Sequence, residues 1–432
     1  MRILVHSIFY TPELTGVAKY AAEMCAWLAS RGHEVEVICP PPYYPQWKIQ
    51  SPYRSWRYRR QNLDGVSVTR CPIWLPRKPG GLQRVLYAAS FAFSSFPMML
   101  TKASWRPDVV FVLEPSLLNA ISSLFLARLT GALTWLQVQD FEIDLAFGLG
   151  QIQQHWLKSL LLRFETSLMR RFDVVSTISH AMLKSLGYKG VSKDRAILFP
   201  NWVDTSEVYP LSVASRLRKQ LCIDEKKVVA LFSGTLGAKQ GIETLIEAAR
   251  ILSRSKTPTV ANILILICGD GPAAERLRSL ASEMDNVRFI PLWPASRLND
   301  LLNIADIHIL PQAVGVADSV LPSKLLGMLA SGRCIAATVT PETEVGQYVK
   351  NCGLLSPPAN AEALATSITR LAADKKMRDQ LGEEARKISL REFRQDLILG
   401  EFEAYLTGLL LRDRKASGAS VSTDNRQTMA SP

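Results

Sequence analysis

Residues 2–39 read RILVHSIFYTPELTGVAKYAAEMCAWLASRGHEVEVIC. The apolar run at 2–9 is typical of a buried strand, residues 18–29 show helical periodicity, and Gly32 stops that helix. Residues 33–39 alternate as a strand does. Strand, helix and strand in this order predict a βαβ unit.

The alternation of strands and helices continues outward from this unit. Strand-like runs occur at 109–113, 133–138 and 174–178, and a helix-length segment covers 157–169. We therefore expect a doubly wound, Rossmann-like N-terminal domain over residues 1–200.

The same pattern begins again after a crossing segment at 198–226. A strand that ends in glycine covers 228–234, an amphipathic helix covers 241–252, and a second strand covers 262–269. These elements predict another Rossmann-like domain over residues 201–390.

The predicted fold class is therefore α/β, with two doubly wound domains that face each other across a cleft. A chain of 432 residues is long enough for two domains of about 100–200 residues each. Residues 391–412 predict a C-terminal helix that can return to the N-terminal domain. Residues 413–432 are rich in Ser, Thr, Gly and Ala and predict a disordered tail.

Composition limits the class of protein. Hydrophobic residues make up 47% of the chain and charged residues 21%, which excludes global disorder. The seven cysteines are scattered without a close pair, so neither a zinc site nor a disulfide framework is expected. The N-terminal apolar run stops at Pro12 and Glu13, so we expect no signal peptide and predict a cytoplasmic location.

Two apolar segments, 85–100 and 109–129, are long enough to suggest a membrane span. Pro97 interrupts the first, and Glu114 and Pro115 interrupt the second. Each is marginal against the roughly 20 apolar residues that a span requires. We expect buried or interfacial helices here.

The positive charge is concentrated in the first domain. Residues 1–200 carry +10 of the net charge of +12. The segment from Lys48 to Arg84, which we call the basic patch, contains nine Lys and Arg residues and a single acid, Asp64. Aromatic residues accompany these cations: Tyr43, Tyr44, Trp47, Tyr53, Trp56, Tyr58 and Trp74. An anionic membrane surface and a single-stranded nucleic acid both suit such a segment.

Ligands of open α/β sheets bind outside the carboxyl ends of the strands, where loops lead into helix N-termini. The loop 10–16 carries Glu13, which offers a carboxylate, and Gly16, which lets a ligand approach closely. After a later buried strand, Gln139 and Asp140 lie at the edge that would face the second domain. A carboxylate there can transfer a proton or orient a hydroxyl group.

Two glycine-containing loops follow strands of the second domain. Residues 232–245 read FSGTLGAKQGIETL and supply amides and the ammonium of Lys239 for a phosphate. The turn of Gly269, Asp270 and Gly271 brings backbone near a base or ribose, although a purely structural tight turn explains it equally well. The spacings match neither a P-loop nor G-x-G-x-x-G, which disfavours an ATPase or an NAD enzyme.

A further candidate is the segment 318–332, which reads DSVLPSKLLGMLASG. Pro322 suits the first turn of a helix, so Ser323 and Lys324 would present a hydroxyl and an ammonium at its positive end. A lysine there opposes the usual preference for acids. The arrangement therefore predicts a site for a diphosphate.

Together these strings resemble the retaining GT-B glycosyltransferases of family 4, and within them the exopolysaccharide enzymes of the colanic acid type. The resemblance covers nearly the whole chain before the tail. It rests on the order and spacing of YTPELTGVAKYAAEM, GHEVEVI, PPYYPQW, LQVQDFEID, FPNWVD, FSGTLGAKQGIETLIEAA, CGDGP and LPSKLLGMLASG.

The resemblance implies roles for residues in both domains. The N-terminal domain would bind the acceptor and the C-terminal domain the nucleotide sugar. Gly16 would lie beside the donor phosphate or the acceptor, and Lys239, Ser323 and Lys324 would hold the diphosphate. Asp140 falls in the segment that borders the reacting sugar, which makes it the catalytic candidate.

Two positions depart from the family pattern. The expected His is Gln139, which we assign with Glu13 to the acceptor. The Glu-x7-Glu pattern is broken, because its second Glu falls at Gly327 and its first near Asp318. Ribose recognition would then use Asp318, together with the turn at 269–271.

The activity implied is transfer of a sugar, with retention, to a lipid-diphosphate-linked saccharide at the inner face of the plasma membrane. GDP-fucose is the preferred donor, while GDP-mannose and UDP-sugars stay open. We expect no metal, no cofactor and no nucleic-acid partner. The alternatives are a nucleic-acid-binding protein that uses the basic patch and a sugar epimerase of the GT-B shape.

Overall fold

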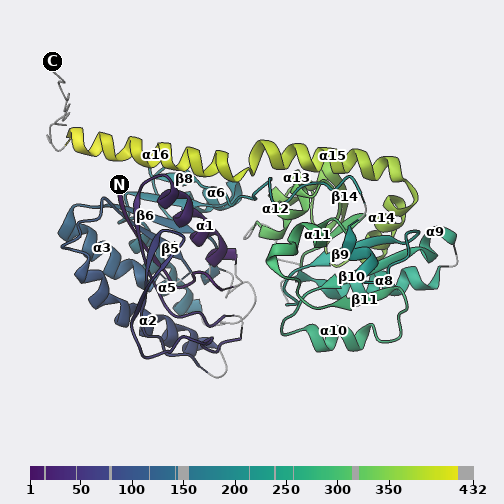
Figure 1. The fold of residues 1–432 in the computed structure, drawn as a ribbon, viewed down its shortest axis with the longest axis horizontal. Helices are drawn as coiled ribbons and strands as arrows, with labels where there is room; N and C mark the ends of the chain where they lie inside the picture. Colours follow the sequence, from purple (N-terminus) through teal and green to yellow (C-terminus); the bar gives the residue numbers. More distant parts are fainter. Residues whose placement is uncertain are drawn as a thin grey trace, which may run out of the picture.

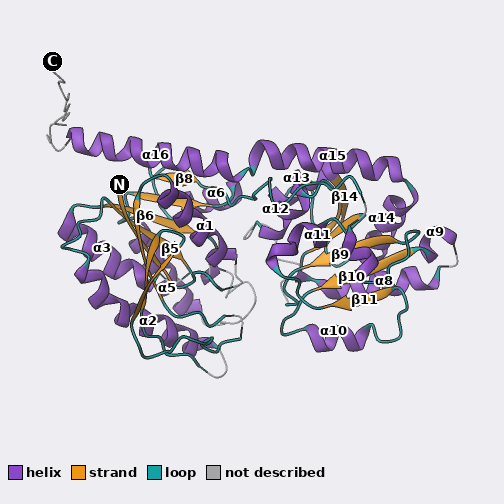
Figure 2. Ribbon diagram, viewed as in Figure 1, coloured by secondary structure: helices purple, strands orange, loops and turns teal. Residues whose placement is uncertain are grey.

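The computed structural model shows two α/β domains side by side, with two long helices running along one side of both (Figures 1 and 2). The structure describes residues 1–13, 16–44, 46–76, 80–115, 117–141, 143–144, 155–213, 215–237, 240–255, 257–313 and 321–416. The predicted diphosphate residue Lys239, the predicted ribose residue Asp318 and the tail at 417–432 lie outside these ranges.

The first domain is built on an eight-stranded sheet in the order β3-β4-β2-β1-β5-β6-β7-β8. All neighbouring strands are parallel except β3 and β4, which form an antiparallel hairpin at one edge. The strands are β1 (Arg2–Ser7), β2 (Glu34–Cys39), β3 (Arg59–Leu63), β4 (Val66–Arg70), β5 (Val109–Glu114), β6 (Leu133–Val138), β7 (Val174–Thr177) and β8 (Ala196–Leu198). Every residue of β5 is buried, because helices cover both faces of the sheet.

The helices of this domain are α1 (Gly16–Ser30), α2 (Gly81–Thr101), α3 (Leu118–Thr130), α5 (His155–Met169) and α6 (His180–Tyr188). The apolar segments considered as spans form α2, β5 and α3. None of the helices in the described part of the chain has the length and apolar character to cross a membrane. Outward-facing residues of α2 and α3 nevertheless include Phe93, which is 85% exposed, and Leu129, which is 58% exposed.

The second domain has a six-stranded, fully parallel sheet in the order β11-β10-β9-β12-β13-β14. Its strands are β9 (Val228–Ser233), β10 (Ile263–Cys268), β11 (Val287–Ile290), β12 (Ile307–Pro311), β13 (Cys334–Thr338) and β14 (Gly353–Ser356). Its helices are α8 (Ile242–Arg254), α9 (Pro258–Ala261), α10 (Ala274–Leu280), α11 (Leu298–Leu302), α12 (Ser323–Ala330), α13 (Glu344–Cys352) and α14 (Ala361–Ala373). The predicted fold class, two Rossmann-like domains, is confirmed.

Each sheet has one point at which the strand order reverses. The reversal lies between β1 and β5 in the first sheet and between β9 and β12 in the second. Loops at the carboxyl ends of such strands diverge to opposite faces, which leaves a crevice for a ligand. The strand order therefore makes the loops that follow β1 and β9 the expected ligand-binding loops of the two sheets.

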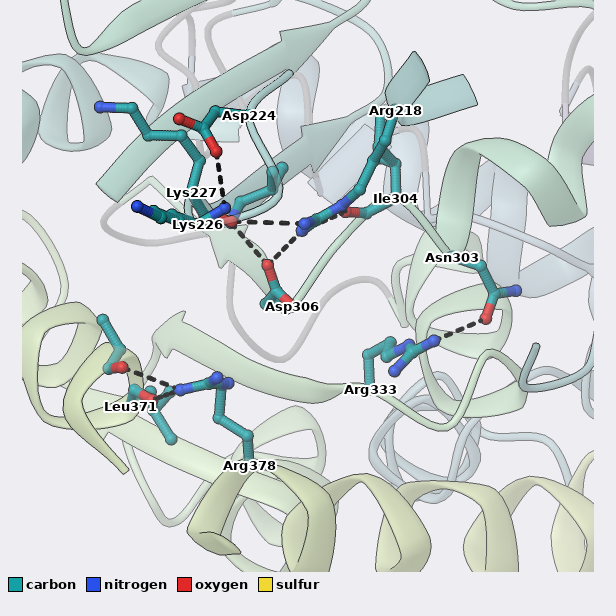
Figure 3. A network of polar contacts seen from close by, with 12 residues as sticks. Arg218, Asp224, Lys226, Lys227, Asn303, Ile304, Asp306, Arg333, Leu371 and Arg378 are labelled. Atoms are coloured by element: carbon teal, nitrogen blue, oxygen red, sulfur yellow. Dashed lines mark hydrogen bonds and ion pairs between the residues drawn. The ribbon is translucent and has the colours of Figure 1, made fainter. Parts of the chain in front are cut away.

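A polar network holds the crossing segment and α7 (Arg216–Gln220) to the second domain (Figure 3). The Arg218 guanidinium donates to Asp306 and to the carbonyl of Ile304. Asp306 also accepts from the backbone N–H of Val229 at 2.8 Å. Because Asp306 and Val229 lie at the amino ends of β12 and β9, this network is structural and lies away from the ligand edge.

A helical arm made of α15 (Lys375–Glu392) and α16 (Gln395–Ala416) crosses both domains (Figure 1). Helix α15 packs on α12 and α13, and α16 then runs back along the first domain. The Phe402 ring stacks on Phe199 with centroids 4.4 Å apart. The helix continues to Ala416, so residues 413–416, which we predicted to be part of a disordered tail, are helical, as the helix-favouring run RDRKA allows.

Candidate functional site

Lys324 lies at the start of α12, at the edge where the second sheet reverses. Its ammonium lies 4.5 Å from the centroid of the Phe232 ring and donates a hydrogen bond to the side-chain oxygen of Gln240. In the ranges that the structure describes, no carboxylate forms an ion pair with it. Burial lowers the pKa of Lys324 to about 7. A partly buried ammonium that lacks a carboxylate partner among the described residues is stabilised by an incoming anion.

Two glycines let the surrounding loops approach this lysine. A Cβ atom at Gly234, which follows β9 directly, would lie 3.7 Å from Cδ of Lys324. A Cβ atom at Gly16, at the start of α1 in the other domain, would lie 3.5 Å from the hydroxyl oxygen of Ser323. The structure therefore brings together Gly16, Ser323 and Lys324, three of the four residues that the sequence assigned to the donor diphosphate.

The turn at Gly269, Asp270 and Gly271 packs against the loop that follows β9. A Cβ atom at Gly269 would lie 2.1 Å from the carbonyl oxygen of Gly234, and one at Gly271 would lie 2.5 Å from that of Leu236. The N–H of Leu236 donates to the carbonyl of Asp270 at 2.9 Å. The glycines thus have a packing reason, and their contact with a nucleotide stays a prediction.

Glu13 is buried in the loop after β1, where it connects that loop to the one after β2. One carboxylate oxygen accepts from the backbone N–H groups of Tyr43 and Tyr44, both at 2.9 Å. Burial raises the pKa of Glu13 to about 7, although these hydrogen bonds act in the opposite direction. Glu13 thus connects the loops that follow β1 and β2, and its contact with the acceptor stays a prediction.

Replacement of Glu13 by alanine is expected to lower the free energy of unfolding by about 3 kcal/mol, because two buried N–H groups lose their acceptor. Glu13→Gln keeps an accepting oxygen without a buried charge and is expected within about 1 kcal/mol of the wild type. Chemical denaturation measures both variants. Equal losses in the two variants would show that the hydrogen bonds to Tyr43 and Tyr44 do not stabilise the loops.

Arg70, at the end of β4, is a second connector that the sequence analysis did not identify. It is fully buried, and its guanidinium donates to the carbonyl oxygens of Pro40, at 3.0 Å, and of Thr11. Its Nε atom has no hydrogen-bond partner in the described chain. Only its position at the end of a strand, next to the loops after β1 and β2, could have indicated this role.

Gln139 is paired with Asn201 at the carboxyl edge of the first sheet. The two amides exchange hydrogen bonds of 3.1 and 3.0 Å, and both side chains are buried. Asn201 belongs to the quoted string FPNWVD, to which we gave no role. The Asn201 amide holds the Gln139 side chain in place. Asp140, the catalytic candidate, is the next residue after Gln139 and is partly exposed.

Two histidines, His6 and His308, are buried and held neutral. Burial lowers the pKa of both His6 and His308 to about 3. His308 contacts the hydroxyl of Ser331 at 2.9 Å. Within the part of the chain that the structure describes, no group of three or more His, Cys, Asp or Glu side chains has an arrangement that could hold a metal ion.

Comparisons with known proteins agree with this geometry. Residues 15–202 match the family described as glycosyl transferase 4-like domain, and residues 213–388 match the glycosyl transferases group 1. The putative colanic acid biosynthesis glycosyl transferase WcaI of Escherichia coli (strain K12) is 39% identical over 378 residues, which cover 85% of this chain and 91% of that protein.

Solved structures share the fold. Sucrose-phosphate synthase from Thermosynechococcus elongatus aligns with a TM-score of 0.72 and 18% identity, covering 96% of this chain and 100% of that one. Anabaena Alr3699/HepE, solved with UDP and glucose, aligns with a TM-score of 0.69 and 14% identity, covering 94% and 99%. The chain is a glycosyltransferase enzyme and belongs to the family 4 glycosyltransferases of the GT-B fold.

Proposed function

We propose that this enzyme transfers a sugar, with retention of configuration, from a nucleotide diphosphate sugar to a lipid-diphosphate-linked saccharide during synthesis of a colanic-acid-like exopolysaccharide. GDP-fucose is the preferred donor. The observation that carries the proposal is the ammonium of Lys324 at the start of α12, which forms no ion pair with a described residue and lies beside the glycine loops of both domains. The name of the Escherichia coli relative and the UDP bound to the Anabaena neighbour support it.

The chemistry follows from the charge that develops on the leaving group. When the bond between sugar and phosphate breaks, the nucleoside diphosphate gains negative charge and the sugar becomes oxocarbenium-like. Lys324, the Ser323 hydroxyl and the N–H groups that begin α12 would stabilise that leaving group without a metal or cofactor. Asp140 would border the reacting sugar, and no described residue is assigned as a covalent nucleophile.

A donor screen followed by an acceptor assay tests the proposal. We expect GDP-fucose to raise the melting temperature more than GDP-mannose or the UDP-sugars, because a ligand that binds only the folded state stabilises it. Release of nucleoside diphosphate should then require a lipid-diphosphate-linked saccharide. A chain that binds no nucleotide sugar, or that releases no nucleoside diphosphate with any such acceptor, is not this transferase.

We also propose that the enzyme works as a cytoplasmic protein bound peripherally to the inner face of the plasma membrane. The basic patch supplies cations, each worth about 1 kcal/mol near an anionic surface. Phe93 and Leu129 expose apolar side chains on α2 and α3, and Trp56 and Trp74 are 68% and 48% exposed. Aromatic rings of this kind favour the depth of the lipid headgroups.

Binding to anionic vesicles is expected to weaken strongly as the salt concentration rises. Exposed charges are screened within about 8 Å at physiological ionic strength and within about 3 Å at 1 M salt. Co-sedimentation with vesicles of phosphatidylglycerol and phosphatidylcholine measures the effect, and vesicles of phosphatidylcholine alone serve as the control. Equal binding at low and high salt would contradict an electrostatic contribution of the basic patch.

A further inference from the structure

The edge hairpin of the first domain borders a pocket lined by arginines. The pocket has a volume of about 440 Å³, and its walls are Pro41, Pro52, Tyr53, Tyr58 and five arginines. Its five arginines are Arg54, Arg57, Arg59, Arg60 and Arg70. We call it the arginine pocket. Its size falls within the range of about 300–1,000 Å³ that is usual for small-molecule sites.

Most of the positive charge around the arginine pocket is not neutralised. In the described part of the chain, Arg54, Arg57 and Arg59 form no ion pair, and the contacts of Arg54 and Arg59 are with the rings of Trp56 and Tyr53. Arg60 shares its acid, Glu36, with a second cation, Lys102. The pocket therefore has an excess of guanidinium groups, whose fork geometry matches phosphate oxygens.

Arg70 connects the pocket to the loops of the candidate site. Its guanidinium lies 5.5 Å from the centroid of Tyr53 in the pocket wall and also donates to the carbonyl of Thr11 in the loop that carries Glu13. Its buried Nε atom lacks a partner in the described residues. Arginines on an edge strand can serve merely to discourage strand pairing, but that role requires neither a buried arginine nor a pocket.

An apolar groove of about 530 Å³ lies next to the arginine pocket. We call it the tryptophan groove, and its apolar walls are Trp47, Ile49, Trp56, Ile73, Trp74 and Leu75. Tyr58 lines the arginine pocket, and its hydroxyl donates to the carbonyl of Ser94, a wall residue of the groove, at 2.8 Å. A site for several negative charges thus adjoins a site for a hydrocarbon chain.

We propose that the arginine pocket binds the diphosphate of the acceptor lipid and that the tryptophan groove holds the first part of its hydrocarbon chain. The inference rests on the proposed transfer to a lipid-diphosphate-linked saccharide. Its ligand is a diphosphate that is esterified at one end by an apolar chain and at the other by the saccharide. The diphosphate is held at the side of the first domain. Arg70 links it to the loop after β1, which carries Glu13 and leads to Gly16. The saccharide then extends toward the donor.

The test uses the full chain, three probes and two double variants. Calorimetric titration is carried out with inorganic pyrophosphate, with farnesyl diphosphate and with phosphatidylglycerol vesicles. The double variant Arg57→Gln with Arg59→Gln should lower the affinity for both pyrophosphate and farnesyl diphosphate by about tenfold or more, because charge-assisted hydrogen bonds are lost. The double variant Trp56→Ser with Trp74→Ser should lower the affinity for farnesyl diphosphate and leave the affinity for pyrophosphate unchanged. These four side chains are exposed, so the variants are expected to fold.

The charge control is Arg216→Gln with Arg254→Gln, which removes two exposed arginines from the second domain. This control should leave all three affinities unchanged. If it weakens the diphosphates as much as the Arg57 and Arg59 variant does, general charge attraction explains the binding and the proposal is wrong. The basic patch itself predicts some loss of vesicle binding in the Arg57 and Arg59 variant, so the soluble diphosphates decide the test. If that variant binds phosphatidylglycerol vesicles more weakly but binds pyrophosphate and farnesyl diphosphate as the wild type does, these arginines bind membrane headgroups only, which also overturns the proposal.

Transfer assays separate this inference from the proposed function. If the wild type releases nucleoside diphosphate with a lipid-diphosphate acceptor, the KM for that acceptor should rise about tenfold in the Arg57 and Arg59 variant. An unchanged KM would overturn the pocket and leave the function standing. If the wild type binds farnesyl diphosphate in the predicted way but no nucleotide sugar, the proposed function fails and the pocket stands.

Discussion

Replacement of Lys324 by alanine is expected to lower turnover with a nucleotide sugar by about 100- to 1,000-fold, the usual effect of removing one preorganised group that stabilises developing charge. The ammonium lies in a partly buried site, where an ionic interaction is stronger than in water. The rate of nucleoside diphosphate release measures the effect. Turnover within a few-fold of the wild type would show that Lys324 does not bind the diphosphate.

A matched variant separates this effect from misfolding. Lys324→Met keeps the length and apolar part of the side chain and removes only the charge. It is expected to lose turnover as the alanine variant does while keeping a melting temperature near that of the wild type. A large fall in melting temperature with Lys324→Met would instead indicate a structural role.

Donor affinity is expected to fall as pH rises above about 7. The lowered pKa of Lys324 means that the ammonium is present below about pH 7 and is progressively lost above it. A bound diphosphate raises this pKa again, so binding at higher pH takes up a proton and becomes weaker with each pH unit. Titration of donor sugar at several pH values measures this slope. Lys324→Arg should abolish it, because arginine stays charged.

Replacement of Phe402 by alanine is expected to lower the free energy of unfolding of the first domain by about 3–5 kcal/mol, as for other buried phenylalanines. The ring stacks on Phe199 and also meets Trp135, with centroids 5.0 Å apart. Its loss leaves a cavity between α16 and the first sheet. Scanning calorimetry is the suitable measurement, because two domains need not unfold in a single transition.

Leu411→Ala provides the matched control on the same helix. Leu411 is 49% exposed, so its replacement should change the free energy of unfolding by no more than about 0.5 kcal/mol. Equal effects of the Phe402 and Leu411 variants would mean that α16 does not contribute to the core of the first domain.

The sequence was sufficient to predict the strands that are buried on both faces of the first sheet. The predicted strands at 109–113, 133–138 and 174–178 are confirmed as β5, β6 and β7 to within a residue. It missed the β3–β4 hairpin, because β3 reads RRQNL and none of its residues is buried. An edge strand with little buried surface lacks the apolar alternation on which such predictions depend.

The sequence predicted those site residues that lie where the loop after the carboxyl end of a strand leads into a helix. Gly16 lies at the carboxyl edge of the first sheet, and Ser323 and Lys324 lie at that of the second, as their positions after strands predict. Only the family resemblance predicted that Gly16 lies with the other two, and the structure places it next to Ser323. The pairing of Gln139 with Asn201 joins residues 62 positions apart, and local pattern carries no information about it. The same holds for Arg70, whose burial depends on loops from two other strands.

The helical arm also has a consequence for how the protein is made. The ribosome adds about 5–20 residues per second, so roughly 10–40 s pass between synthesis of Phe199 and of Phe402. During that time the nascent first domain leaves its Phe199 and Trp135 rings without the partner that later covers them. The contacts that Phe402 makes with these two rings can therefore form only after α16 has been synthesised.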